Sequence, residues 1–245
     1  MDYDVKGALT YFFKDKHLIL KTVIAYIIVG ICSIMNVMAK RAPSPEIGLV
    51  ILVITFLFDI PIRGYIVNVA HQRIIKPKNE LPDWSNFFKY LKDGFIIELM
   101  SLIYIVIPAT ITIKMLMPVL IIRIADTRVN LIVFILAIIL LLISVLLMFA
   151  AYLSYACDLK FKSIFNFKAF KFLMIKNKKE FSNYISLIIL AMICCGTLSL
   201  VLTITIVGIL LIPILVFYVQ LYCADIQAQF LRHIFKIGKK QTTNG

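Results

Sequence analysis

Residues 130–156, NLIVFILAIILLLISVLLMFAAYLSYA, contain no charged residue and no proline. A helix needs about 20 apolar residues to cross the hydrocarbon of a bilayer, and this stretch is longer than that. It therefore predicts a transmembrane helix, which places the chain among integral membrane proteins.

Five more apolar stretches of similar length occur in the chain. They run over Leu18 to Met38, Gly48 to about Ile75 after the helix cap Ser44-Pro45-Glu46, a stretch from near Phe95 that carries Pro108, about Tyr184 to Thr203, and about Gly208 to Phe230. The prediction is an all-α fold, a polytopic membrane helix bundle with six transmembrane helices in three helix pairs. Residues 1–235 would form a single transmembrane domain, and 236–245 a cytoplasmic tail.

The composition excludes an ordinary soluble domain. Of the 245 residues, 62% are hydrophobic and 16% are charged, with a mean hydropathy of +0.97. A soluble domain carries about 25% charged residues. Since there are too few polar residues to cover a core of this size, the bilayer must take the place of water around most of the chain.

The end of the third predicted span is ambiguous in the sequence, because Lys114 and Pro118 interrupt the apolar residues of 108–122. The span could stop near Ile113 and leave Met115 to Ile122 at the outer interface, or it could tilt and run to Ile122. A short re-entrant segment is a third interpretation. We favour the first.

Positive charge is gathered on one side of the predicted membrane. With six spans, 20 of the 26 Lys and Arg residues fall in the segments of one side. Cytoplasmic loops carry such an excess, which predicts a multi-pass protein of the cell membrane with both termini cytoplasmic. The net charge of +13 lies in short segments between apolar stretches. This placement favours the lipid bilayer, and anionic lipids in particular, over nucleic acid as the partner.

Three segments rich in Phe and Lys precede the three helix pairs: Asp4 to His17, Asp83 to Gly94 and Lys162 to Ile175. They predict amphipathic interfacial helices and pseudo-repeats over 1–76, 82–156 and 160–232. An alternative is that they are elbow helices which only connect spans and pack on the bundle. The candidate lipid-interface residues are Phe12, Phe13, Trp84, Phe87, Phe88, Lys89, Lys92, Phe167 and Phe170.

Three charges form a candidate intramembrane polar site: Asp59, Arg63 and Asp225. Asp59 and Arg63 share one helix face, about 20 Å from the helix start. A charge at that depth costs about 2.5–3.5 kcal/mol, so each needs a partner or water. Asp59 and Arg63 could neutralise each other along the face, or each could reach another helix. Asp225 could pair with Arg63 or Arg73. Such a site could be an interhelical clamp, or a site for substrate, ion or proton.

Several short motifs carry a family resemblance. They are Arg63-Gly64-Tyr65, Leu81-Pro82-Asp83-Trp84, Phe88, Asp93-Gly94, Tyr104, Pro108, Pro213, Phe217-Tyr218 and Gln227. The chain resembles the prokaryotic membrane proteins grouped as domain of unknown function 4013, and more distantly the membrane domain attached to some glycerophosphodiester phosphodiesterases. The resemblance implies a compact helical membrane domain without assigned catalytic residues. One departure is that the fourth span lacks the proline expected toward its cytoplasmic end.

No local enzyme signature is present: there is no G-x-S-x-G, P-loop, dinucleotide-binding glycine motif or H-E-x-x-H. We therefore expect no enzyme, no cofactor and no metal. The predicted function is a non-enzymatic integral membrane module that binds lipid or a membrane protein partner through amphipathic cytoplasmic-face helices. The alternative is a transporter or channel for a small solute or lipid that uses Asp59, Arg63 and Asp225.

Overall fold

The computed structural model describes residues 3–76, 80–121 and 127–242, and side chains except at 118–121, 127–130, 167, 206–207, 209 and 236–242. These residues are almost entirely helical, and no strand occurs among them. The long helices are α2 (Leu18–Lys40), α3 (Pro45–Ile75), α4 (Phe87–Ser101), α5 (Ile107–Ile121), α6 (Thr127–Asp158), α8 (Lys178–Leu202) and α9 (Ile206–Thr242). The short ones are α1 (Val5–Thr10), η1 (Tyr11–Lys14), η2 (Trp84–Asn86), η3 (Leu102–Val106), η4 (Phe161–Phe165), α7 (Phe167–Lys171) and η5 (Phe172–Lys176).

Six helical stretches of the described chain are long and apolar enough to cross a membrane. They are Leu18–Lys40, Pro45–Ile75, Trp84–Met117, Leu131–Asp158, Lys178–Leu202 and Leu210–Phe235. The predicted all-α fold with six membrane helices is therefore confirmed. The predicted pairing is confirmed as well, because α2 packs on α3, α5 on α6, and α8 on α9.

The start of α3 shows how local chemistry sets a boundary. The Ser44 hydroxyl accepts a hydrogen bond from the backbone N–H of Ile47 at 3.4 Å, and Pro45 occupies the first turn. A serine cap satisfies an N–H that has no partner within the helix, and a proline in the first turn sacrifices no bond. The start predicted from Ser44-Pro45-Glu46 is thus confirmed.

The third span is one continuous helical path rather than a helix that breaks near Ile113. The path runs from α4 through the π-helical turn η3 into α5, which ends at Ile121. Pro108 has no N–H to give the carbonyl of Tyr104, and the wider π turn directly precedes it. Lys114 is exposed, and its long side chain can reach toward water without ending the helix. The helix therefore does not end near Ile113, and the position of residues 115–121 relative to the bilayer stays a prediction.

The amphipathic segments take different forms. The first is α1 followed by η1, and the third is η4, α7 and η5. The second is not a separate helix, since α4 begins at Phe87 and continues directly into the third span. The pseudo-repeat boundaries stay a prediction.

The structure divides into two compact units. Unit 1 contains Met1–Phe95 and Asn177–Gly245, and unit 2 contains Ile96–Lys176. In unit 1, α3 packs against both α2 and α9, and α9 also packs against α8. Its core contains large side chains that are at most 1% exposed, among them Tyr65, Phe217, Leu221 and Phe230.

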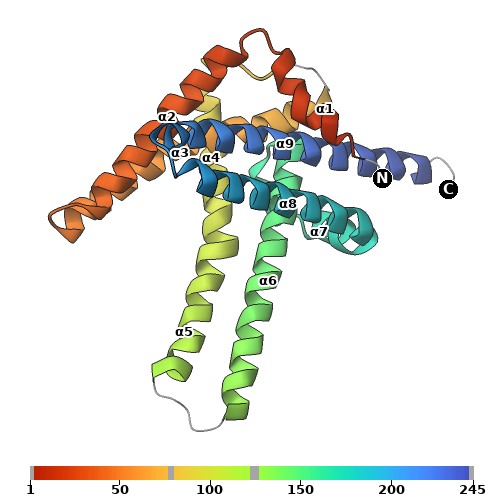
Figure 1. Cartoon of the computed structure of the whole chain (residues 1–245). Coiled ribbons are helices and arrows are strands. Elements are labelled where there is room, and N and C mark those ends of the chain that lie inside the picture. The colour runs from red at the N-terminus through yellow and green to blue at the C-terminus, as the bar shows by residue number, and fades with distance from the viewer. Residues whose placement is uncertain (1–2, 77–79, 122–126, 243–245) are drawn as a thin grey trace. The chain divides into compact units, whose positions relative to one another are not determined.

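Unit 2 is built on α5 and α6, which run side by side in Figure 1. The Tyr104 hydroxyl donates to the carbonyl of Ile164 at 2.8 Å, which ties η3 to η4. Helix α6 ends at Asp158. The next residue, Leu159, has a φ of 54° in the left-handed region, and its N–H bonds the carbonyl of Tyr155. The Asp158 carboxylate then accepts from the Ser163 hydroxyl at 2.6 Å.

Long apolar surfaces remain uncovered by protein in both units. Only 11% of the most apolar part of Leu131–Asp158 is buried, and only 6% of that of Lys178–Leu202. Exposed side chains there include Leu142, Ile143, Met192 and Leu200. Such continuous apolar surface is stable against lipid and not against water, so the chain is a multi-pass membrane protein.

Two glycines let α3 and α4 touch through their backbones. A Cβ at Gly64 would overlap the carbonyl oxygen of Tyr90, and a Cβ at Gly94 would overlap the carbonyl oxygen of Ile60. The contact is reciprocal, because each helix gives a glycine and a facing carbonyl. Small residues allow membrane helices this close approach.

We expect Gly64→Ala and Gly94→Ala each to destabilise the protein by about 3 kcal/mol, because the added methyl must push two backbones apart. Thermal unfolding of the purified protein in detergent measures the effect. Gly30→Ala and Gly196→Ala are matched controls, since no atom lies within 4 Å of a Cβ built at either glycine. They should be neutral or slightly stabilising. A loss of the same size in all four variants would contradict the crossing.

Candidate functional site

A buried ion pair joins α3 to α9. The Arg73 Nε lies 2.5 Å from Asp225 Oδ1, and the two side chains are 11% and 0% exposed. The sequence left Arg63 and Arg73 open as partners for Asp225, and the pairing with Arg73 is confirmed. Two charges removed from solvent need this attraction, because either alone would carry a large desolvation cost.

Two residues near the amino terminus, Asp4 and Tyr11, lie next to this ion pair and its neighbour Gln229. The Gln229 amide donates to Asp225 Oδ2 at 2.8 Å, accepts from the N–H of Asp4 at 2.9 Å and donates to the carbonyl of Asp4 at 3.1 Å. The Arg73 guanidinium lies over the ring of Tyr11, 4.4 Å from its centre. One residue, Gln229, therefore connects the amino-terminal segment to the buried carboxylate.

Asp59 and Arg63 form a separate pair on the face of α3. Arg63 Nε lies 2.7 Å from Asp59 Oδ2, and the two side chains are 44% and 37% exposed. They neutralise each other along one helix face, which is one of the two arrangements expected from the sequence. Arg73 lies ten residues beyond Arg63, about 15 Å along the helix. Asp225 is therefore paired at a different level of α3 from Asp59.

A second buried cluster, centred on Lys21, was not recognised in the sequence. Its ammonium lies 2.9 Å from Asp15 Oδ2 and 3.1 Å from Asp83 Oδ1, and it donates to the carbonyl of Leu81 at 2.6 Å. The N–H of Leu81 donates to the same Asp15 oxygen at 2.6 Å. These contacts join the amino-terminal segment, the start of α2 and the loop before η2.

Aromatic rings fix the same loop from the other side. Trp84 stacks on Tyr65 with ring centres 4.3 Å apart, and Tyr90 meets both rings edge to face. The Tyr65 hydroxyl donates to the carbonyl of Pro82 at 3.0 Å, and the Tyr90 hydroxyl donates to that of Asp83 at 2.6 Å. The motif Leu81-Pro82-Asp83-Trp84 is thus held in one conformation.

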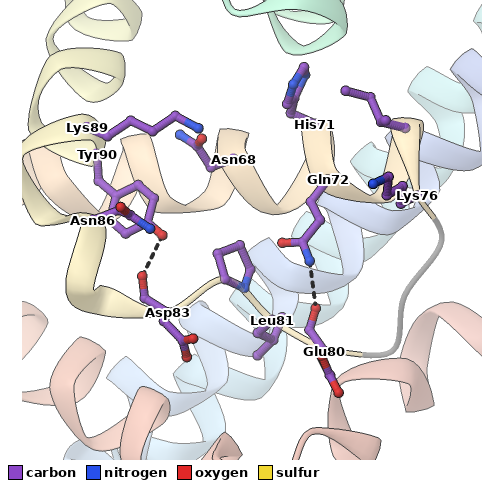
Figure 2. Close-up of a pocket in the computed structure, with 12 residues that line it drawn as sticks. Asn68, His71, Gln72, Lys76, Glu80, Leu81, Asp83, Asn86, Lys89 and Tyr90 are labelled. Atoms are coloured by element: carbon purple, nitrogen blue, oxygen red, sulfur yellow. Dashed lines mark hydrogen bonds between the residues drawn. The ribbon is translucent and has the colours of Figure 1, made fainter.

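A polar pocket of about 430 Å³ lies between the end of α3, this loop and the start of α4 (Figure 2). We call it the α3–α4 pocket. Its lining is Asn68, His71, Gln72, Ile75, Lys76, Glu80, Leu81, Pro82, Asp83, Asn86, Lys89 and Tyr90. Most of these side chains carry hydrogen-bonding groups, which sets the pocket apart from the apolar faces of the spans. Sequence reasoning identified Lys89 but not the pocket, because its lining comes from three separate segments.

The family model described as "Protein of unknown function (DUF4013)" matches residues 47–211. The chain belongs to this family. The match takes in nearly all of α3, the loop with Trp84, and both glycines of the crossing, and it ends before Asp225. No curated protein and no solved structure matches the chain.

In this DUF4013 protein, the predicted lipid-interface residues divide by burial. Phe12 and Phe170 are 3% and 4% exposed, and their rings pack on Tyr218 and Tyr104. Trp84 is partly buried, and the side chain of Phe167 lies outside the described set. The remaining residues are exposed: Phe13, Phe87, Phe88, Lys89 and Lys92. Helical periodicity predicted these stripes, but it could not distinguish a protein neighbour from lipid.

Among the described residues, no group of three or more His, Cys, Asp or Glu side chains could hold a metal ion. The side chains that line the α3–α4 pocket offer hydrogen-bonding groups and charge.

We expect Asp225→Asn to destabilise the protein by about 3 kcal/mol, because it leaves the Arg73 charge buried beside a neutral amide. Thermal unfolding in detergent measures the loss. The double variant Arg73→Met with Asp225→Leu should recover much of it, since two apolar side chains leave no buried charge. An unchanged melting temperature in Asp225→Asn would contradict the pairing.

We expect the folded protein to lose stability in acid when the Asp15 carboxylate is protonated. Burial alone would raise its pKa, but hydrogen bonds from Lys21 and from the N–H groups of Leu81 and His17 outweigh burial and hold the pKa below its ordinary value. A lowered pKa in the folded state gives stability that is complete above about pH 4 and is lost as pH falls further. Unfolding curves from pH 7 to pH 3 should show this loss. In Asp15→Asn the protein should be less stable at pH 7, with a shallower acid dependence; the wild-type slope there would contradict this role.

Proposed function

We propose that this DUF4013 protein is a non-enzymatic module of the cell membrane that binds anionic lipid at the cytoplasmic ends of its helices, with both termini cytoplasmic. The observation that carries the proposal is the start of α4, where Phe88 is 83% exposed and stands directly before Lys89. A ring that dips into the acyl boundary beside a cation at the headgroup level is the arrangement of interfacial helices.

The same pairing of ring and cation recurs elsewhere. Phe13 is 61% exposed and precedes Lys14 in η1, and Phe161 is 45% exposed and precedes Lys162 in η4. All three places fall in the segments that the excess of positive charge assigns to the cytoplasmic side. A basic segment near an anionic leaflet gains about 1 kcal/mol for each Lys or Arg, so several such places support a preference for anionic lipid.

The start of α4 is also held rigidly, which supports recognition rather than loose adhesion. Lys21, Tyr65 and Tyr90 all hydrogen-bond to the loop that leads into the helix. A surface that is ordered before binding loses less entropy when it binds.

The alternative of a transporter organised around Asp59, Arg63 and Asp225 gains no support from the contacts of these residues. Asp59 pairs with Arg63, and Asp225 pairs with Arg73. Each of these two ion pairs, which lie at different levels of α3, gives its carboxylate the partner that the sequence analysis expected for an intramembrane charge. We therefore retain the lipid-binding proposal, with a membrane protein partner as the second possible ligand of the same surface.

Trp84 is the only tryptophan in the chain, so its fluorescence reports on the start of α4 alone. In bilayers that contain the full-length protein, brominated phosphatidylglycerol should quench Trp84 about twice as strongly as brominated phosphatidylcholine at equal mole fraction. High salt should remove the difference, because it screens the lysines.

The variant Lys14→Gln with Lys16→Gln removes the two exposed charges on either side of Asp15, which bonds the loop before Trp84. It should weaken the preference for phosphatidylglycerol while leaving the quenching by phosphatidylcholine unchanged. Equal quenching by the two lipids in the wild-type protein would contradict the proposed function.

A further inference from the structure

The α3–α4 pocket places two cations where no described carboxylate neutralises them. Lys76 and Lys89 both line it, and neither forms an ion pair within the described part of the chain. His71, also in the lining, adds a ring that can donate or accept hydrogen bonds. The pocket therefore offers donors and positive charge to an anion.

Its two acidic residues do not cancel this charge. Figure 2 shows the carboxylates of Glu80 and Asp83 on the side of the loop away from His71 and Lys89. Asp83 turns instead toward Lys21, 3.1 Å from that ammonium. The negative charge of the lining is thus directed out of the space in which an anion would sit.

Neutral amides complete the lining and are held in place. Asn68 is 4% exposed, and its amide donates to the carbonyl of Gly64 at 2.8 Å and to Asp93 at 2.7 Å. The Gln72 amide donates to the carbonyl of Glu80 at 3.4 Å. Their oxygens, with the amide of Asn86, are suited to hydroxyl groups. Fixed polar groups of this kind give a site specificity.

The size and position of the pocket indicate the kind of anion. Its volume of about 430 Å³ lies in the range of small-molecule sites, which is about 300–1,000 Å³. It is larger than a phosphate group needs and leaves room for a polyol. Ile75 lines it and is 57% exposed, so the pocket has an apolar edge at the carboxyl end of α3. An anion with an attached apolar tail fits this combination.

We propose that the α3–α4 pocket binds the phosphate-bearing headgroup of a membrane lipid. Lys76 and Lys89 contact the phosphate oxygens, and His71, Gln72 and Asn86 contact the hydroxyl or ester oxygens beside it. The inference rests on the proposed lipid-binding function and adds a defined site and ligand chemistry to it. Phosphate is a strong partner for ammonium groups, because charge-assisted hydrogen bonds are about twice as strong as neutral ones.

The test titrates the full-length protein in detergent with dioleoyl phosphatidic acid and follows lipid-bound species by native mass spectrometry. Lys89→Gln should weaken the binding about tenfold. Lys92→Gln is the matched control, since Lys92 is exposed on the same helix, loses the same charge and does not line the pocket. It should change the binding less than twofold. If Lys89→Gln does not fold, Lys76→Gln is a second pocket variant. It should also weaken the binding.

Equal effects of Lys89→Gln and Lys92→Gln would overturn the proposal that lipid binds in the pocket. Binding would then be diffuse over the surface, and the proposed lipid-binding function would stand. A wild-type protein that binds phosphatidic acid no better than phosphatidylcholine would overturn both proposals.

Oleate, an anion without phosphate, should not compete with phosphatidic acid. Competition by oleate would contradict the proposed recognition of phosphate. Glycerol 3-phosphate tests the source of the phosphate. Binding of this soluble compound without binding of phosphatidic acid would overturn the lipid as ligand.

Discussion

Gly64 contacts the backbone of α4, and Gly94 contacts the backbone of α3. This reciprocal contact is the constraint on which the pocket-bearing end of unit 1 depends. It fixes the distance between α3 and the start of α4, and the α3–α4 pocket is bounded by those two helices. It also brings Asn68 within 2.7 Å of Asp93, so a polar bond reinforces the crossing. In a membrane, where burial of apolar surface gives helices little reason to associate, close packing and such bonds hold them together.

Buried polar groups are the second constraint on the structure, because they fix the relative positions of segments that apolar contacts alone do not determine. Leucine and isoleucine faces can slide past one another with little change in energy, whereas a buried charge has few acceptable positions. Lys21 fixes the loop before η2, and Arg73 fixes α9 against α3. A buried ion pair is weak evidence for stability, and its best-supported role is to select one arrangement among several.

The sequence predicted those features whose signal is local. Apolar length predicted six spans, and Ser44-Pro45 predicted the start of α3. The spacing of Asp59 and Arg63 gave their ion pair as one of two alternatives. Features made by residues far apart were missed. Gly64 and Gly94 lie on different helices in no repeated motif, and the pocket combines three segments. The stripe that contains Phe12 has the right period for an interfacial helix, yet Phe12 is buried against Tyr218, because periodicity does not reveal what lies opposite a face.

The bonds of Gln229 to Asp4 have a consequence for biogenesis. They join residues 225 positions apart in the sequence, and Arg73 is 152 positions from its partner Asp225. Because a ribosome releases the chain from its amino end, the arginine reaches the bilayer well before its carboxylate has been synthesised. Until then water, lipid phosphate or the insertion machinery must solvate it. The bonds of α9 to α3 and to the amino-terminal segment can therefore form only late, after the last helix has been made.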